Sequence, residues 1–312
     1  MEILNEQQWL ERLKSQQHTP RSSYRAMYST WWQGVVTDPR LMLVPVDDHQ
    51  VHRGDAVFEA MKARNGRIYL EAEHLDRLDR SAAAIALACP FDRARLKGIL
   101  QDTLQASGLK DALLRLFLSR GPGSFSTNPY ESVGAQVTLI VTELKGLPEA
   151  TVRNGVSLAL SKIPPKEGWQ ARVKSCNYLP NVLMKKEAVD LGVDFTVALT
   201  EKGELTEGST ENMVVVTRDG WLARPRPERI LAGTTMMRAF SLARQLVAEG
   251  LLTGVGERDL SVADLREARE ILMIGTTLDV VAATRFEGVA VGAGGPGPVS
   301  SRLREMILSD QS

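Results

Sequence analysis

A lysine and a glutamate are the residues whose types and settings best suit catalysis. Lys174 opens the stretch Lys-Ser-Cys-Asn-Tyr-Leu-Pro-Asn, at the end of a short extended segment and just before a predicted helix. Glu207 opens Glu-Gly-Ser-Thr-Glu-Asn, just before a predicted strand. Lysine amines form Schiff bases with carbonyl compounds, and pyridoxal phosphate is the common carbonyl cofactor. A single lysine or glutamate is usually a solvated surface group, so this pair alone leaves both interpretations open.

Two glycine-hydroxyl segments could bind an anion. Gly233-Thr234-Thr235 stands where a helix is predicted to begin, and free amides at a helix start attract phosphate. Gly275-Thr276-Thr277 follows a predicted strand. Taken alone, the first segment is better explained by a plain helix cap, and the second is weak evidence for an anion site. The sequence contains neither a Walker phosphate loop nor a dinucleotide-binding motif. The histidines lack a metal-ligand pattern, so we expect no metal site.

Composition limits the class of protein. The 312 residues suit two domains or one large α/β unit, and 38 basic residues balance 38 acidic ones, which argues against nucleic acid as the main partner. The two cysteines, Cys89 and Cys176, give no disulfide framework and indicate a reducing compartment. The acidic N-terminus is unlike a signal peptide, and no apolar run approaches the ~18 residues of a membrane helix. We therefore expect a cytoplasmic protein with no membrane partner.

Hydrophobic periodicity divides the chain into two domains of alternating strands and helices. In the first half, helices are expected at 2–17, 71–88 and 92–107, and strands at 41–46, 57–62, 66–70, 112–119 and 136–141. Residues 18–30 look irregular. In the second half, strands are expected at 153–161, 193–200, 212–217, 221–224, 270–274 and 283–291, and helices at 178–191, 235–249, 261–268 and 299–308. Glycine and proline, which interrupt helices and strands, occur within residues 146–152. This segment is the predicted linker between domains 1–145 and 153–312.

Several motifs in one order resemble the class IV aminotransferases, from about residue 40 to residue 308. They are His52-Arg-Gly-Asp-Ala-Val-Phe-Glu59, His74-Leu-Asp-Arg-Leu78, Lys174 with Asn177-Tyr-Leu179, Glu207 to Asn212, Leu231-Ala-Gly-Thr-Thr235 and Gly275-Thr276. Each motif is weak alone, whereas six in order are specific. One departure is Met236, where many members carry arginine, and we expect it to alter local packing or interface contacts without removing the cofactor.

The resemblance implies pyridoxal-phosphate fold type IV, an α/β architecture with a small N-terminal domain, a larger C-terminal domain and the cofactor between them. It also implies a homodimer. Lys174 would be the Schiff-base lysine and the catalytic base, and Glu207 would meet the pyridine nitrogen of pyridoxal 5'-phosphate. The remaining cofactor contacts implied are Arg77, Tyr178, Thr234, Thr235 and Thr276.

The substrate is harder to assign, because the branches of the family share the cofactor motifs. Ser119-Arg120-Gly-Pro-Gly123 resembles the loop of 4-amino-4-deoxychorismate lyases, but the second arginine of the bacterial lyases is missing. The arginine-x-histidine trap of bacillary D-amino acid enzymes is also absent. The combined motifs most resemble plant-type D-amino acid transaminases, so amino acids and 2-oxo acids are the expected substrates. Arg53, Arg120 and Thr277 are the hypothesised substrate contacts, and a structural salt bridge is the alternative for either arginine. Lyase activity and branched-chain L-amino acid transamination remain alternatives.

Overall fold

The structure is a computed structural model that describes residues 1–16 and 19–312, so residue 17 of the first predicted helix lies outside the described residues. Its contacts separate the chain into two compact units. One unit comprises residues 1–69 and 85–144, and the other comprises residues 70–84 and 145–312. Residues 70–84, which the sequence placed in the N-terminal domain, group with the second unit. The limits of the two domains and the linker at 146–152 remain predictions.

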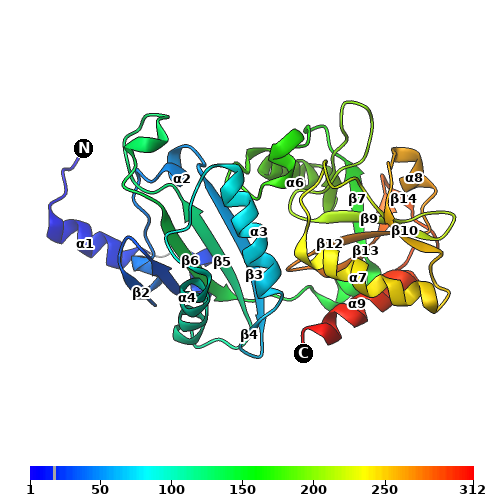
Figure 1. The fold of residues 1–312 in the computed structure, drawn as a ribbon, viewed down its shortest axis with the longest axis horizontal. Helices are drawn as coiled ribbons and strands as arrows, with labels where there is room; N and C mark the ends of the chain where they lie inside the picture. The colour runs from blue at the N-terminus through cyan, green and yellow to red at the C-terminus, as the bar shows by residue number, and fades with distance from the viewer. Residues whose placement is uncertain (17–18) are drawn as a thin grey trace. The chain divides into compact units, whose positions relative to one another are not determined.

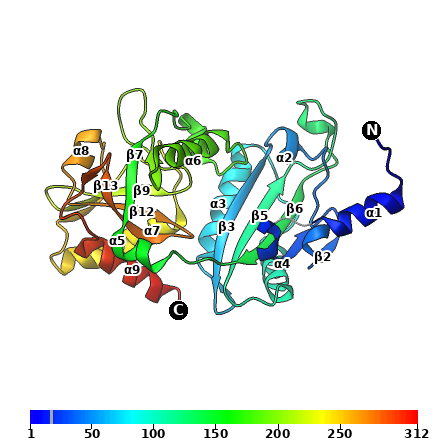
Figure 2. The ribbon, with the colours of Figure 1, turned by 180° about the vertical axis from the view of Figure 1, so that it is seen from behind.

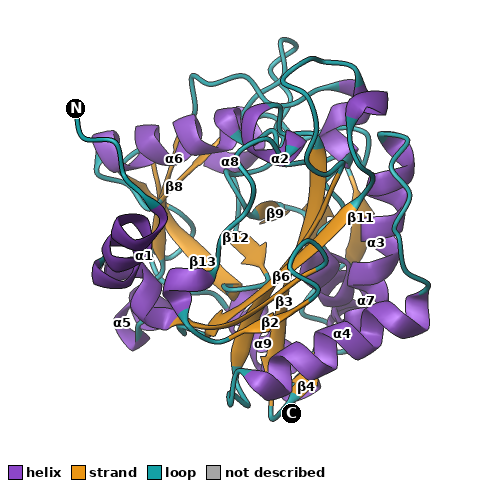
Figure 3. Cartoon of the chain, turned by 90° about the vertical axis from the view of Figure 1, so that its left-hand side faces the viewer, coloured by secondary structure: helices purple, strands orange, loops and turns teal. Residues whose placement is uncertain are grey.

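The first unit is built on an antiparallel sheet. In its described part the strand order is β2 (Gly34–Val36), β1 (Tyr24–Ser29), β6 (Gln136–Glu143), β5 (Ala112–Ser119), β3 (Ala56–Arg64) and β4 (Arg67–Ile68). Helix α4 (Arg93–Ala106), labelled in Figure 3, packs against β1 and β6, and Asp92 caps its start. The other helices of this unit are α1 (Glu6–Ser15) and α2 (His49–His52). Asn65-Gly66, a dipeptide typical of two-residue turns, forms the hairpin turn between β3 and β4, with both residues at positive φ.

Two predictions for the first unit are wrong. Residues 24–29, which look irregular in sequence, form β1 and pair on both sides with β2 and β6. Residues 41–46 were expected to form a strand, but they follow a short 3-10 turn (Pro39–Leu41) and carry no strand assignment. Pro39 and Pro45 remove backbone donors and restrict the chain there, which outweighs the apolar character of the segment.

The second unit contains a mixed sheet and several helices. The described strands run in the order β11 (Gly254–Glu257), β10 (Trp221–Arg224), β9 (Asn212–Val216), β12 (Glu270–Gly275), β13 (Asp279–Phe286), β7 (Val156–Leu160) and β8 (Phe195–Val197), and β14 (Val289–Ala290) pairs with β13. The helices are α3 (Glu71–Ala84), α5 (Glu149–Asn154), α6 (Leu179–Leu191), α7 (Thr234–Ala248), α8 (Val262–Arg266) and α9 (Pro298–Asp310). Figures 1 and 2 show α7 and α9 side by side against this sheet.

Successive apolar side chains of the central strands point to opposite faces of this sheet, so each face carries a hydrophobic core. On β12, Ile271 and Met273 face one core, whereas Leu272 and Ile274 face the other. The second core is completed by the apolar stripes of α7 and α9, which include the fully buried Leu246. Met236, the residue that departs from the family motif, also lies in this core at the first turn of α7. The sheet therefore gives rigid support to the loops at its ends.

The second unit differs from the prediction at three places. Residues 149–154 form the short helix α5, which Pro148 precedes and Gly155 ends at a φ of 73°, so that the strand predicted from 153 begins at Val156. The segment predicted as one strand at 283–291 is the end of β13, a turn at Glu287-Gly288 and β14. Strand β11 at Gly254–Glu257 was not predicted, because its two glycines give no alternating pattern.

Candidate active site

The chemistry-bearing loops of the second unit meet at one end of its sheet. Asn212, the first residue of β9, pairs with Ile274, close to the end of the antiparallel strand β12. The loop that holds Glu207 precedes β9, and the loop that holds Thr276 follows β12, so the two loops emerge together. Helix α7 begins at Thr234, and its hydrophobic face is fixed on the same sheet. The pairing register is therefore what assembles segments that are distant in the sequence.

One pocket collects the residues predicted to bind the cofactor. Its lining includes Arg77, Lys174, Tyr178, Glu207, Thr234, Thr235 and Thr276. These residues come from α3, from the start of α6, from both loops and from α7, and all of them belong to the second unit. The structure thus brings all seven together, while their individual roles stay predictions. Among the described residues no group of three or more histidine, cysteine or acidic side chains could hold a metal ion.

Lys174 is a buried amine with a defined neighbour. A 3-10 turn at Gly168–Arg172 delivers the chain to it, and its backbone N–H donates to Ser81 Oγ of α3 at 3.2 Å. Lys174 Nζ donates to the Tyr178 hydroxyl at 3.3 Å, one helical turn further along the chain. Only 9% of the lysine is exposed. The amine is consequently held in the pocket, where a carbonyl carbon could reach it.

Glu207 presents a carboxylate inside the same pocket. Its Oε2 accepts hydrogen bonds from Asn212 Nδ2 at 3.0 Å and from the Leu231 backbone N–H at 3.1 Å. Desolvation raises the pKa of Glu207 to about 8, although the Leu231 N–H and the positive charges of Lys174, Lys166 and Arg77 oppose this rise. A protonated ring nitrogen would stabilise the ionised form of this buried carboxyl group, because its positive charge would compensate for the water that burial removes.

The start of α7 could bind an anion. Gly233 caps the helix without a side-chain hydrogen bond, and the first intrahelical bond runs from Met237 N–H to Gly233 carbonyl, which leaves first-turn amides for a ligand. Thr234 and Thr235 are both buried, and Thr234 Oγ1 lies 3.1 Å from His74 Nε2. Arg77, also buried, donates from Nη1 to the Ala232 carbonyl at 3.1 Å, so its cation lies beside the helix start.

The polar groups of the pocket fit pyridoxal 5'-phosphate. A Cβ at Gly233 would come within 1.9 Å of Asn212 Oδ1, so only glycine permits this close approach. Asn181 Oδ1, also at the pocket, is buried and has no hydrogen-bond partner among the described residues, which suits a ligand donor. Guanidinium, hydroxyl and helix-start donors at one place, with an amine and a carboxyl group beside them, match the phosphate, aldehyde and ring nitrogen of the cofactor.

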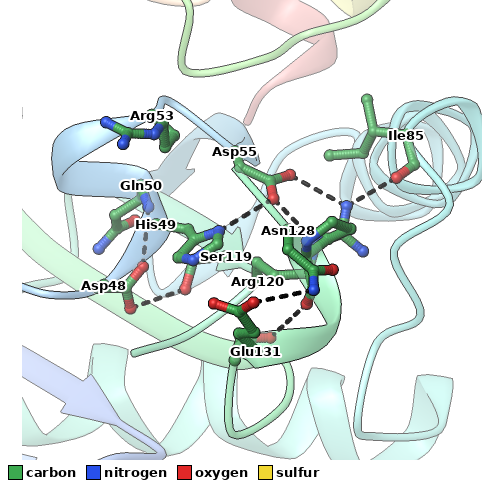
Figure 4. A network of polar contacts seen from close by, with 12 residues as sticks. Asp48, His49, Gln50, Arg53, Asp55, Ile85, Ser119, Arg120, Asn128 and Glu131 are labelled. Atoms are coloured by element: carbon green, nitrogen blue, oxygen red, sulfur yellow. Dashed lines mark hydrogen bonds and ion pairs between the residues drawn. The ribbon is translucent and has the colours of Figure 1, made fainter. Parts of the chain in front are cut away.

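Arg120, a hypothesised substrate contact, is engaged inside the first unit. Its Nε and Nη2 donate to the two Asp55 oxygens at 3.0 Å, and the guanidinium also donates to the carbonyls of Ile85 and Ala86 at 2.8 Å. Figure 4 shows the two side chains joined, with His49 approaching Asp55 at 3.5 Å. Binding of a substrate carboxylate would require an exchange of these bonds. This geometry favours the structural salt bridge that the sequence left as the alternative.

Arg53 and Thr277 are placed differently. Arg53 lies apart from the network in Figure 4 and donates to the carbonyls of His52 and Phe125. Its side chain is exposed, so it has solvent-facing donors. Thr277 follows Thr276 but is not among the residues that line the pocket. The substrate roles of Arg53 and Thr277 therefore remain predictions.

Replacing Arg120 with alanine should weaken the first unit. Asp55 would lose a bidentate partner at a site where only 16% of the Arg120 side chain and 23% of the Asp55 side chain are exposed. We expect a loss of about 2–4 kcal/mol in the free energy of unfolding, because a partly buried carboxylate and two carbonyls lose their donors. Urea denaturation measures this change, and Arg53→Ala is the control, with a loss below about 1 kcal/mol. Equal stabilities of Arg120→Ala and the parent protein would contradict the structural role.

Sequence reasoning missed two asparagines of the site. Asn212 donates to both Glu207 Oε2 and the Leu231 carbonyl, and thereby ties the carboxylate to the segment before α7. Asn181 donates to the Ser209 carbonyl. Asn181 ends the stretch that begins with Lys174, and Asn212 ends the stretch that begins with Glu207. The partners of their side chains include residues far along the chain, which a local motif does not reveal. Lys166, which lines a neighbouring pocket, belongs to no motif and had no signal in the sequence.

Comparison with known proteins agrees with this geometry. The family model described as amino-transferase class IV matches residues 56–286. The chain is 37% identical over 288 residues to the chloroplastic D-amino-acid transaminase of Arabidopsis thaliana, covering 92% of this chain and 76% of that protein. It is 29% identical over 271 residues to the D-alanine aminotransferase of Bacillus licheniformis, covering 86% of this chain and 93% of that protein.

A solved structure supports the same assignment. A hypothetical aminotransferase from Mycobacterium tuberculosis in its PLP-bound form has a TM-score of 0.75 and 26% identity, covering 91% of this chain and 98% of that one. The chain therefore belongs to the class IV aminotransferases and has their pyridoxal-phosphate fold type IV. It is a pyridoxal-phosphate-dependent aminotransferase, with pyridoxal 5'-phosphate as its cofactor. None of its described helices is both long and apolar enough to span a membrane.

Proposed function

We propose that the protein transfers amino groups between D-amino acids and 2-oxo acids, with Lys174 as its catalytic residue. The observation that carries this proposal is the joint presence of Lys174, Glu207 and the α7 anion site in one pocket. The D-specificity is supported by 37% identity over 92% of the chain to a D-amino-acid transaminase. A D-alanine aminotransferase also matches, at 29% identity.

Lys174 would supply both the covalent attachment and the proton transfer. When bound, the cofactor supplies an aldehyde for the amine and a ring that withdraws electrons from the carbon next to the substrate nitrogen. Once the substrate amine has displaced it, Lys174 Nζ would act as the base that removes the proton from that carbon and returns it to the cofactor carbon on the other side of that nitrogen. Its bond to the Tyr178 hydroxyl holds the nitrogen within the pocket during both tasks.

The other residues would bind and orient the cofactor. Glu207 would hold a proton on the ring nitrogen, while Asn212 and the Leu231 N–H fix the carboxylate for this contact. The phosphate would lie at the start of α7, where Thr234, Thr235 and Arg77 meet, with Thr276 from the neighbouring loop. Arg53 and Thr277 are proposed as substrate contacts, whereas we assign Arg120 to the fold of the first unit.

Branched-chain transamination is a second candidate, because the putative branched-chain-amino-acid aminotransferase of Methanocaldococcus jannaschii is 29% identical over 87% of the chain. A half-reaction distinguishes the candidates without a coupling enzyme. D-alanine mixed with the purified protein should remove the visible absorbance of the lysine-linked cofactor, whereas L-leucine should leave it unchanged on the same timescale. The reverse preference would assign the branched-chain function. Release of 4-aminobenzoate from 4-amino-4-deoxychorismate, without loss of that absorbance, would indicate the lyase.

We also propose a homodimer and a cytoplasmic location. The homodimer is supported by apolar side chains that α6 leaves exposed next to the site, among them Leu179 at 68%, Val182 at 59% and Val189 at 65%.

The cytoplasmic location is supported by the cysteine content. The chain has two cysteines only, Cys89 and Cys176, and neither forms a disulfide. The relative from Arabidopsis thaliana is a chloroplastic protein, so the compartment is a separate question from the activity.

A further inference from the structure

A second lysine lies beside the candidate active site. Lys166 belongs to the loop between β7 and α6, and its Nζ lies 4.7 Å from the centroid of the Tyr178 ring. Lys174 Nζ lies 5.8 Å from the same centroid and donates to the hydroxyl of that ring. The Tyr178 ring is therefore in contact range of two ammonium groups, at distances typical of cation–π pairs.

Lys166 also borders the space around Glu207. It lines a pocket next to the cofactor pocket, and the two pockets share Lys174, Tyr178, Asn181 and Glu207. Within the described residues, the Lys166 ammonium has neither a hydrogen-bond nor an ion-pair partner, although it is partly buried. Burial lowers the pKa of Lys166, while the charges of Glu207 and Cys176 oppose that fall. A partly buried cation that has no direct ion-pair partner exerts a field over its neighbours.

We propose that Lys166 is a positioning residue of this enzyme, which holds the Tyr178 ring and makes the Lys174 nitrogen less prone to hold a proton. This inference rests on the proposed function of Lys174. Its physical basis is that like charges disfavour each other, so a fixed cation near the ring opposes a second one at the Lys174 nitrogen. An amine that gives up its proton more readily is a better nucleophile near neutral pH.

Other titratable or charged groups lie around the two pockets that Lys174 lines. They are Arg77 of α3, Glu207 before β9, Arg229 before α7, and the Tyr178 and Cys176 side chains on its own segment. Arg229 is paired with Glu204 and Asp259 at 2.8 Å, which reduces its field. Arg77 and Glu207 are unchanged in every variant below. The effect of Lys166 can therefore be isolated by changing that residue alone.

The test is the pH titration of the visible absorbance of the purified holoenzyme. Lys166→Met keeps the length of the side chain and removes its charge, and it should raise the titration midpoint of the Lys174-linked chromophore by about half a unit to one unit. Lys166→Arg retains the cation and should stay within about 0.2 units of the parent. Lys162→Met removes an exposed lysine from the same loop and is the matched control. If Lys166→Met is unstable, Lys166→Gln replaces it.

The outcomes separate this inference from the proposed function. In one outcome, the chromophore of the protein is attached to Lys174 and Lys166→Met leaves the titration midpoint unchanged. This result would overturn the role of Lys166 and leave the proposed function intact. Equal shifts in Lys166→Met and Lys166→Arg also overturn it, because they would report the shape of the residue and not its charge. A parent protein with no chromophore on Lys174 would overturn both.

Discussion

Lys174→Ala should abolish transamination. In the described pocket, Lys174 is the only residue whose amine donates to the Tyr178 hydroxyl. Without this amine, the protein has neither the group that would bind the cofactor covalently nor the base that would move the proton. General base catalysis alone contributes about 10²–10⁴-fold, so we expect the rate of the half-reaction with D-alanine to fall by at least about 10⁴-fold. Stopped-flow absorbance with cofactor added in excess measures that rate directly.

The control for this variant is another lysine of the same region. Lys186 lies on α6, pairs with Asp190 and is well exposed, so Lys186→Ala should keep the parental rate. Added cofactor should still bind to Lys174→Ala, because the anion site at the start of α7 is unchanged. A Lys174→Ala protein that retains more than about a hundredth of the parental rate would place the base elsewhere.

Glu207→Gln should give the second largest effect. Glutamine can still accept from Asn212 Nδ2 and the Leu231 N–H, so the local geometry should survive while the negative charge is lost. Without that charge the ring nitrogen is protonated less, and electrons leave the substrate carbon less readily. We expect a loss of about 10²–10³-fold in kcat/KM, at a Kd for the cofactor that changes far less. A parental kcat/KM would contradict the role of the carboxylate.

The same carboxyl group should make the stability of the cofactor-free protein depend on pH. Its pKa is raised to about 8 in the folded chain, from 4.5 as an ordinary glutamic acid, so the folded state binds more protons than the unfolded state between these values. The free energy of unfolding should therefore decrease as the pH rises through this window, by a few kcal/mol in total. Urea denaturation from about pH 5 to about pH 8.5 measures the slope. Glu207→Gln should flatten it, and Glu201→Gln, which changes an exposed carboxyl group, should not.

The sequence predicts those parts of the molecule that local signals encode. Asp92 caps α4, Asn65-Gly66 turns the β3–β4 hairpin, and Asp219-Gly220 turns the chain between β9 and β10. These signals act over a few residues and do not depend on distant partners. The site motifs are local in the same sense, and this is why residues such as Lys174 and Thr234 could be picked out.

What the sequence did not predict depends on partners far along the chain. Strand β1 shows no regular alternation of apolar and polar residues, and it is stabilised by pairing with β6, more than a hundred residues later. The partner of Arg120 was also not predicted, because its loop motif says nothing of Asp55, which accepts hydrogen bonds from the guanidinium. Lys166 became visible only when the fold placed it over the Tyr178 ring. Tertiary pairing of charges and strands is the information that periodicity cannot supply.

Borohydride reduction of the purified protein, followed by peptide mass mapping, tests the central assignment most directly. Reduction traps the cofactor on the nitrogen that carries it. The predicted result is a phosphopyridoxyl group on the peptide that contains Lys174, together with loss of the visible absorbance. A label on another lysine, such as Lys166, or no label on a protein supplied with cofactor, would contradict the account.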